Sequence, residues 1–193
     1  MQKTSYYIIN AVTIYRLVAS FFLLYLVFTE QPDIFKWMLA VSFFTDAIDG
    51  FLARKYKVSS VMGARLDSIA DDLTILVAII GVFKLKPEFV RQELVLIIIM
   101  LALVVIQTVM ALVRYKKVSS FHTYLAKLAA VLQGSFLILL FFVSQTPLWL
   151  FYIAVVVTIV ELSEEIILVI LLPEWQANVK GLYWVTKKKR GNR

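Results

Sequence analysis

The sequence predicts an all-α integral membrane protein with six transmembrane helices and both termini in the cytoplasm. The chain has 193 residues, of which 61% are hydrophobic, and its mean hydropathy is +0.84. Soluble domains are only about 45–50% apolar, and a disordered chain needs low hydrophobicity and high charge. A spanning helix takes about 20 residues, so six of them leave room for loops and short tails but for no large soluble domain.

Six apolar stretches appear along the chain, separated by segments rich in charge or turn-forming residues. We expect each stretch to be a helix, because backbone in contact with lipid must satisfy its hydrogen bonds internally. A membrane β-barrel would instead need shorter strands of alternating polarity. The first stretch is interpreted as a span rather than a signal peptide, because no small-residue cleavage site follows it. The predicted helices cover approximately residues 8–29, 34–53, 61–83, 93–113, 123–144 and 148–172.

The distribution of positive charge predicts the orientation. With both termini on one side of the membrane, that side holds most of the 20 Lys and Arg residues, and cytoplasmic loops carry such an excess. We therefore expect the loops around 54–57 and 114–117 to face the cytoplasm. The predicted organisation is one six-helix domain over 1–186, followed by a basic, flexible tail over 187–193 that associates with the membrane surface.

The net charge is +7 and the chain contains no cysteine. In a membrane protein, the expected partners of basic segments are anionic lipid headgroups, and no nucleic acid partner is expected. The lack of cysteine excludes disulfides, thiolate metal sites and cysteine nucleophiles.

Two aspartates lie in the second apolar stretch, where ionisable residues are costly and usually mark a functional site. They are Asp46 and Asp49. Gly50 and Ala53 lie on the same helical face, because the four residues are spaced i, i+3, i+4 and i+7. These small residues leave space beside the carboxylates, and Arg54 is placed to meet a phosphate.

The third apolar stretch carries a matching face. Gly63, Asp67 and Asp71 follow one another at intervals of four residues, which places them on one side of the helix. Asp72 points elsewhere on its helix and is interpreted either as structural or as a group that supports the metal ligands from behind. Because the two helices are antiparallel and joined by a short loop, the four aspartates of the two faces are expected to converge near the cytoplasmic surface.

Four converging carboxylates repel one another unless cations lie between them. Their donor atoms are all oxygen, which suits Mg²⁺, Mn²⁺ or Ca²⁺, and two such ions can clamp the attacking and leaving oxygens of a phosphoryl displacement. For any one aspartate, an ion pair with Arg16 or Arg65 is the alternative. The predicted metal ligands are Asp46, Asp49, Asp67 and Asp71.

These residues form one pattern, Asp46-x2-Asp49-Gly50-x2-Ala53-Arg54-x8-Gly63-x3-Asp67-x3-Asp71. It resembles the signature of the CDP-alcohol phosphotransferase family at every defined position. Upstream, Asn10-x2-Thr13-x2-Arg16-Leu17 is similar to a segment that many members carry. The resemblance implies a six-helix enzyme of the cytoplasmic (inner) membrane, often a homodimer, with its active site facing the cytoplasm. Such an enzyme transfers a phospho-alcohol group from a CDP-alcohol to the hydroxyl of a second alcohol and releases CMP.

The resemblance also implies roles for the matching residues. The four aspartates would bind divalent metal, Mg²⁺ or Mn²⁺ with two ions per subunit, around the donor pyrophosphate. Asp71 would also be the catalytic base that acts on the acceptor hydroxyl. The residues expected to line the cytidine-diphosphate pocket are Gly50, Ala53, Arg54, Gly63, Asn10 and Thr13.

The acceptor alcohol stays open, with CDP-diacylglycerol as the expected donor. The third and fourth aspartates lie in Asp67-Ser-Ile-Ala-Asp71-Asp72, which is more similar to the phosphatidylserine and phosphatidylinositol-phosphate branches than to the Asp-Pro-Leu-Ala-Asp-Lys of phosphatidylglycerophosphate or cardiolipin synthases. Glycerol-3-phosphate, inositol phosphate, serine or another polar alcohol all stay candidates. The candidate acceptor-binding residues are Arg114, Lys127, Arg65 and Glu161.

Two other functions are compatible with parts of this sequence. A membrane cation transporter would use intramembrane carboxylates to bind ions, but its sites lie near the midplane and do not require the small residues of the pattern. An inactive, family-like scaffold would not need all four aspartates. Glu161, Glu164 and Glu165 in the last stretch are expected either to offset the acceptor-site cations or to line a dimer interface, and His122 is expected at an interface or pocket edge rather than on a metal.

Overall fold

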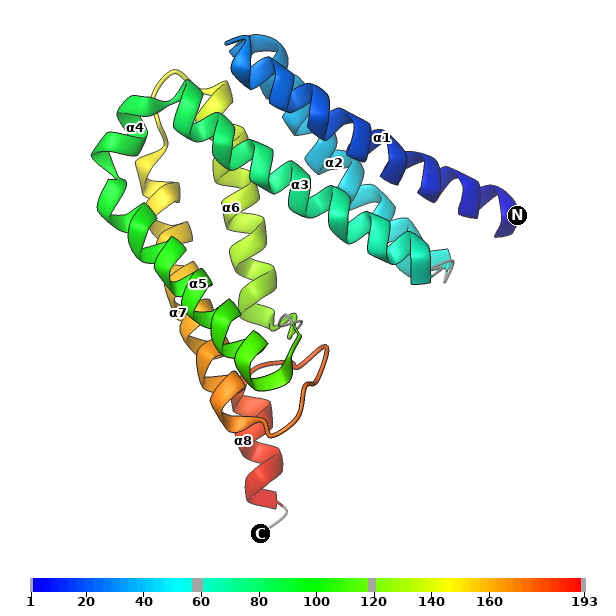
Figure 1. Cartoon of the computed structure of the whole chain (residues 1–193), viewed down its shortest axis with the longest axis vertical. Helices are drawn as coiled ribbons and strands as arrows, with labels where there is room; N and C mark the ends of the chain where they lie inside the picture. The colour runs from blue at the N-terminus through cyan, green and yellow to red at the C-terminus, as the bar shows by residue number, and fades with distance from the viewer. Residues whose placement is uncertain (1, 57–60, 118–120, 192–193) are drawn as a thin grey trace. The chain divides into compact units, whose positions relative to one another are not determined.

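The computed structural model describes the backbone of residues 2–56, 61–117 and 121–191, and within it the side chains of 13–46, 48, 66, 69–117 and 121–187. Within these ranges the regular secondary structure is all helical, with no β-strand (Figure 1). The all-α prediction is therefore confirmed. The helices are α1 (Gln2–Phe28), α2 (Pro32–Tyr56), α3 (Val61–Leu85), α4 (Pro87–Gln92), α5 (Leu94–Tyr115), α6 (Tyr124–Phe142), α7 (Leu148–Leu171) and α8 (Leu182–Gly191).

Each predicted apolar stretch coincides with one of the long helices. By length and composition, α5 and α6 are apolar enough to cross a membrane, and α1 contains a shorter apolar segment over Thr13–Phe28. Charged residues interrupt the other long helices, as the glutamates do in α7. The number of spans and the side on which the termini lie stay predictions.

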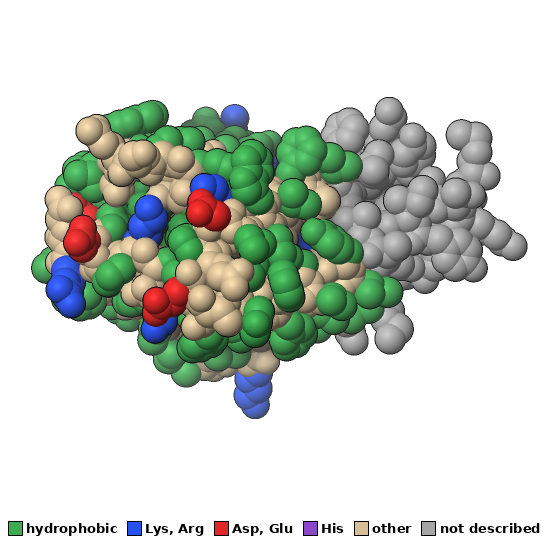
Figure 2. Space-filling view, turned by 90° about the horizontal axis from the view of Figure 1, so that it is seen from above, with side chains coloured by type: hydrophobic (Ala, Val, Ile, Leu, Met, Phe, Trp, Pro, Cys, Tyr) green, Lys and Arg blue, Asp and Glu red, His purple; other side chains and the backbone are tan. Residues whose placement is uncertain are grey.

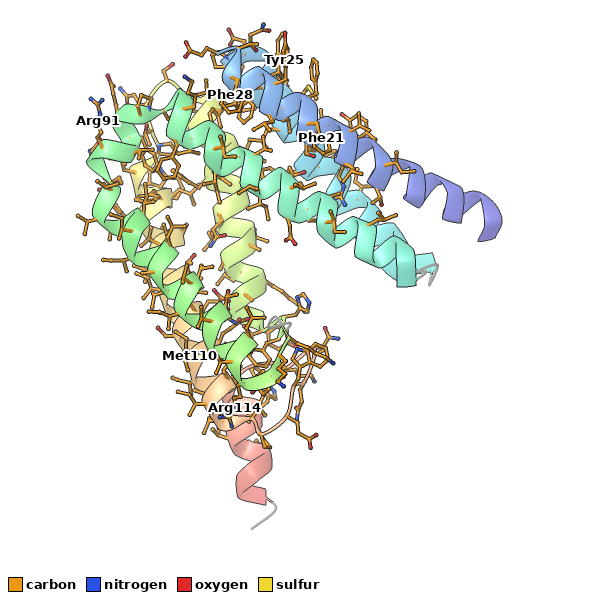
Figure 3. The ribbon with its side chains drawn as sticks, in the orientation of Figure 1. Phe21, Tyr25, Phe28, Arg91, Met110 and Arg114 are labelled. Carbon is orange, nitrogen blue, oxygen red and sulfur yellow. The ribbon has the colours of Figure 1, made fainter. Side chains whose placement is uncertain are left out.

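The surface of these helices is unusually apolar. Phe21, Tyr25 and Phe28, spaced along the outer side of α1 (Figure 3), are 57% to 66% exposed, and most of the apolar side chains of α5 are exposed as well. Figure 2 shows a face on which hydrophobic side chains surround a few acidic and basic groups. Monomeric soluble proteins rarely expose such contiguous apolar surface, so these helices are those of a membrane protein.

The chain divides into two compact units, Met1–Arg91 and Gln92–Arg193, and each is described by itself. In the first unit, α1 packs extensively against both α2 and α3, whereas the described parts of α2 and α3 contact each other less. The buried stripe of α1 that faces them includes Ala19, Leu23 and Val27, at the spacing of one helical face. As a result α1 is the element that holds the two aspartate-bearing helices together.

In the second unit, polar side chains lie between apolar helices. The amide of Gln107 on α5 donates to the carboxylate of Glu165 on α7 at 2.7 Å, and Gln133 on α6 donates to the hydroxyl of Thr158 on α7 at 2.7 Å. Polar groups away from water need such partners. The two bonds therefore connect α7 to both of its neighbours.

Part of the basic tail expected over 187–193 lies within a helix. Helix α8 runs to Gly191, so the backbone of 187–191 is helical. The carboxylate of Glu164 on α7 accepts a hydrogen bond from the amide of Leu182 at 2.8 Å, and Leu182 and Val185 pack against a buried apolar cluster. The first turn of α8 is therefore held by a hydrogen bond, and the apolar side of the helix is packed. The basic charge of the segment predicts neither contact.

A close approach between α2 and α3 depends on a glycine. A Cβ atom added at Gly81 would lie 2.6 Å from the ring of Phe35, a side chain that is fully buried. We expect Gly81→Ala to destabilise the first unit by about 1–3 kcal/mol, because a buried ring that cannot move away makes this an overpacking change. Thermal unfolding of the purified protein in detergent measures the effect.

Gly134 on α6 is the matched control for this prediction. No atom of the described residues lies within 4 Å of a Cβ added there. Replacing a helical glycine by alanine at an open position is worth roughly 0.5–1 kcal/mol in favour of the helix. Gly134→Ala should therefore leave the melting temperature unchanged or raise it, and an equal loss in both variants would contradict the role assigned to Gly81.

Candidate functional site

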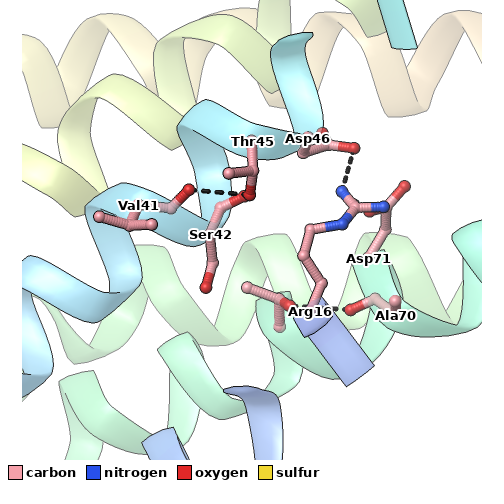
Figure 4. Close-up of polar contacts among 8 residues, drawn as sticks. Arg16, Val41, Ser42, Thr45, Asp46, Ala70 and Asp71 are labelled. Atoms are coloured by element: carbon pink, nitrogen blue, oxygen red, sulfur yellow. Dashed lines mark hydrogen bonds and ion pairs between the residues drawn. The ribbon is translucent and has the colours of Figure 1, made fainter. Parts of the chain in front are cut away.

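A buried arginine joins the two aspartate-bearing helices (Figure 4). Arg16 of α1 is 1% exposed, and its Nη1 donates a hydrogen bond to Oδ1 of Asp46 on α2. The same nitrogen lies 2.6 Å from Oδ1 of Asp71 on α3. One guanidinium therefore bridges the first and the last aspartate of the motif. The ion pair considered as an alternative for a single aspartate is present for both.

The helices place these groups at the same level for a simple reason. α2 and α3 are antiparallel, and Asp46 precedes the connecting loop by about the same length of helix as Asp71 follows it. Neighbouring hydroxyls do not compete for the carboxylates, since Thr45 and Thr74 donate to the backbone carbonyls of the preceding turn, at 2.9 Å and 2.8 Å. The charged groups are thus left to pair with one another.

A small pocket of about 30 Å³ lies beside this ion pair. The Asp46 and Asp71 side chains are 43% and 34% exposed, whereas Arg16 is enclosed. The carboxylates can therefore be reached by a ligand and the guanidinium cannot be reached by solvent. The residues that line the pocket are Arg16, Ser42, Phe43, Asp46, Asp71, Thr74 and Ile75.

Three polar residues of the pocket lie outside the predicted site residues, namely Arg16, Ser42 and Thr74. Arg16 is predicted as an alternative ion-pair partner and belongs to the upstream segment that resembles the family, whereas Ser42 and Thr74 have no predicted role. The signal was nevertheless available, because Ser42 precedes Asp46 by four residues and Thr74 follows Asp71 by three, which places each on the same helical face as its aspartate. Both are buried, at 1% and 4% exposure.

Most of the other residues of the motif lie where only the backbone is described. Thr13 is buried one turn before Arg16 on α1, on the same face, and Asp72 is exposed and does not line the pocket. For the remaining predicted residues the structure assigns a helical backbone, and their side chains lie outside the described residues. These are Asn10 on α1, Asp49, Gly50, Ala53 and Arg54 on α2, and Gly63, Arg65 and Asp67 on α3.

Two of the four predicted metal ligands are therefore described. Among the side chains that the structure describes, no group of three or more His, Asp or Glu is arranged to hold a metal ion. Asp46 and Asp71 themselves are partly exposed oxygen donors from two facing helices. This donor chemistry fits a hard cation such as Mg²⁺, and Arg16 already supplies one positive charge at the same oxygens.

The candidate acceptor residues of the second unit have structural contacts of their own. Nε of Arg114 donates to the carbonyl of Leu172 at 3.2 Å, and the hydroxyl of Tyr115 lies 2.9 Å from the same oxygen. Together they bind the end of α7, where helical carbonyls lack intrahelical partners. Nζ of Lys127 lies 5.5 Å from the centre of the Tyr124 ring, a cation–π contact.

Two glutamates of α7 also have hydrogen-bond partners within the second unit. Glu165 binds Gln107 inside the second unit, and Glu164 binds the first amide of α8. Gly181, which precedes that amide, has a φ of 145°, and a Cβ added to it would lie 3.0 Å from Glu164 Oε1. Glu161 is buried on the same helix, and His122 is exposed with a φ of 52°. Two of the three glutamates thus serve helix packing.

Comparison with known proteins places this chain in a family. The chain is similar to the CDP-diacylglycerol–inositol 3-phosphatidyltransferase of Saccharomyces cerevisiae, with 36% identity over 66 residues. That match covers 34% of this chain and 30% of the yeast protein. No solved structure matches the chain. The family model described as CDP-alcohol phosphatidyltransferase matches residues 6–160, which cover most of α1, all of α2 and α3, and the ion-paired aspartates. With that match over most of its length, the chain belongs to the CDP-alcohol phosphatidyltransferase family.

Proposed function

We propose that this protein is a phospholipid-synthesising membrane transferase. It moves a phosphatidyl group from CDP-diacylglycerol, or a similar CDP-alcohol, to the hydroxyl of a polar alcohol and releases CMP. Membership of the family supports the reaction class, and the yeast relative, a CDP-diacylglycerol–inositol 3-phosphatidyltransferase, supports the donor. The observation that carries the proposal is the meeting of Asp46 and Asp71, from two helices, at one pocket.

The reaction is a direct displacement at phosphorus. The acceptor oxygen attacks the phosphorus that carries the lipid, and the bond from that phosphorus to the bridging oxygen breaks. CMP leaves with the electron pair, and the acceptor proton passes to the carboxylate of Asp71. A side chain 34% exposed is accessible for this role, and the contact with Arg16 orients it.

The four aspartates Asp46, Asp49, Asp67 and Asp71 are proposed to hold Mg²⁺ or Mn²⁺, two ions per subunit. When bound, such ions neutralise the donor pyrophosphate and make the acceptor hydroxyl easier to deprotonate. Arg54 is proposed to contact a donor phosphate. The proposed lining of the nucleotide pocket is Asn10, Thr13, Gly50, Ala53 and Gly63.

The setting of the site is part of the same proposal. Six spans with both termini in the cytoplasm would place the loop between α2 and α3, and hence the pocket, on the cytoplasmic side of the inner membrane. The bias of Lys and Arg supports this orientation. A homodimer is proposed from the family resemblance, and Arg65, Arg114, Lys127 and Glu161 stay candidate contacts for the acceptor.

The test is CMP release by the purified protein with CDP-diacylglycerol and Mg²⁺. Serine, glycerol-3-phosphate, inositol, inositol-1-phosphate and phosphatidylglycerol are supplied separately, and the lipid product is identified by mass. We expect release that depends on one of these acceptors, with only slow release when the donor is supplied alone. If no acceptor supports release and the protein does not bind cytidine nucleotides, the proposed function is wrong.

A further inference from the structure

We propose that Arg16 is a positioning residue that acts as a built-in counter-ion for the site. It holds Asp46 and Asp71 together in the protein without a divalent cation, and it competes with a cation for the same carboxylates. The ion bridge itself is a property of the fold, whereas the competition rests on the proposed function.

The position of Arg16 on its helix is unusual. It lies in the buried stripe of α1, between Thr13 and Ser20, which are 3% and 1% exposed. The hydroxyl of Ser20 donates to the carbonyl of Leu17 at 2.7 Å, so it has a hydrogen-bond partner within α1. A guanidinium stays charged at any pH that a protein tolerates, and a buried charge is strongly unfavourable without a partner. The helix therefore depends on the carboxylates that Arg16 meets.

Those carboxylates come from two helices that pack mainly through α1. Since α1 contacts both α2 and α3 extensively, the guanidinium is held at a fixed place between them. Its Nη1 contacts one oxygen of Asp46 and, at 2.6 Å, one oxygen of Asp71. Arg16 thus sets the separation of the two carboxylates before any ligand arrives, which is the advantage of a preorganised site.

The charges at this bridge do not cancel. Among the described side chains, one guanidinium faces two carboxylates, which leaves one negative charge in excess, and both carboxylates are partly exposed at the pocket. A cation that approaches from the pocket is attracted by the carboxylates and repelled by Arg16. Removing the charge of Arg16 should therefore have two opposite effects. The cation-free protein should become less stable, and a divalent cation should stabilise it more.

The other ion pairs of the first unit provide a control. Lys84 and Glu30 lie 3.2 Å apart, but their side chains are 45% and 68% exposed. Exposed pairs of this kind contribute little to stability, and this one is remote from the pocket lining. Lys84→Gln removes the same amount of charge as Arg16→Gln from the same unit without disturbing a buried group.

The experiment is thermal unfolding of the full chain in detergent, in EDTA and during a Mg²⁺ titration. In EDTA, we expect Arg16→Gln to melt several degrees below the wild type. The control Lys84→Gln should melt at the temperature of the wild type. In Mg²⁺, the rise in melting temperature of Arg16→Gln should exceed that of the wild type, with half of the rise at a several-fold lower Mg²⁺ concentration. Arg16→Lys keeps the charge and should therefore recover most of the wild-type stability in EDTA. Its rise in melting temperature with Mg²⁺ should be small, as in the wild type.

The outcomes separate the role of Arg16 from ordinary packing. A variant destabilised only by lost packing would melt lower by the same amount with and without Mg²⁺, which would overturn the competition. If Arg16→Gln melts at the same temperature as the wild type in EDTA, the proposed counter-ion role of Arg16 is wrong. If Arg16→Gln does not fold, the triple variant with Asp46→Asn and Asp71→Asn should fold again in EDTA and lose the Mg²⁺ response, because it leaves no unpaired charge. Failure of that variant to recover would also count against the proposal.

These readouts do not depend on turnover. If the stability changes appear but no acceptor supports CMP release, the counter-ion stands and the transferase proposal fails. If CMP is released and Arg16→Gln responds to EDTA and Mg²⁺ as the wild type does, the transferase stands and the counter-ion proposal fails.

Discussion

Asp71→Asn is expected to lower CMP release by about 10²–10⁴-fold, the usual contribution of a general base. The amide cannot accept the proton of the acceptor hydroxyl at the step proposed here. The fold should survive, because Arg16 keeps its contact with Asp46 when Asp71 loses its charge. The measurement is the steady-state rate of CMP release with CDP-diacylglycerol, Mg²⁺ and the acceptor that supports turnover.

Asp72→Asn is the matched control, since it makes the same chemical change at the next position. Asp72 is exposed and does not line the pocket. Its replacement should therefore keep most of the activity, and melting curves of both variants should show that each is folded. Equal losses in the two variants would argue against a specific role for Asp71, and full activity of Asp71→Asn would exclude it as the base.

Removal of divalent cations is expected to reduce CMP release to the background rate, and Mg²⁺ or Mn²⁺ to restore it. The two phosphate groups of the donor pyrophosphate are negatively charged, and so are the carboxylates of the motif. Cations must therefore lie between the donor and the carboxylates when the donor binds. The ligands are all oxygen atoms, and zinc prefers nitrogen and sulfur, so Zn²⁺ should restore less activity. The measurement is the rate after dialysis against EDTA, followed by addition of each metal separately.

Replacing one of the proposed ligands tests the metal site directly. Asp46→Asn should raise the Mg²⁺ concentration needed for half of the maximal rate, because it weakens one of the proposed ligands. Glu30→Gln removes a carboxylate of the same unit that is exposed and paired with Lys84, and it should leave the Mg²⁺ requirement unchanged. A full rate in EDTA, or the same Mg²⁺ dependence in both variants, would contradict the proposed metal site.

The helices of this protein are well predicted from local pattern alone. Runs of apolar residues broken by charge and proline indicate helices close to those observed, such as 94–115 and 148–171, because lipid-exposed backbone has few other options. The end of the chain is predicted less well. α8 forms where Glu164 binds the amide of Leu182, and that contact joins residues that are distant in the sequence.

The acceptor candidates show a similar limit. The charge of Arg114 suggests a ligand contact, and the structure adds a partner within the unit, because its Nε donates to a carbonyl at the end of α7. The acidic residues of α7 suggest a cavity, whereas Glu165 binds Gln107 between two helices. A charged residue in an apolar helix needs a partner, but the pattern of one helix does not say whether that partner is a substrate or another helix.

Periodicity within a helix is a local property, and it places Asp46 on one face of α2 and Asp71 on one face of α3. Their approach to each other also follows from the short connection between antiparallel helices. Arg16 is different, because it lies on α1 and meets both aspartates only where α1 packs between their helices. The motif could therefore be read from residue spacing, whereas the charge at its centre depends on which faces of three helices are buried together, and that is settled by packing over the whole unit.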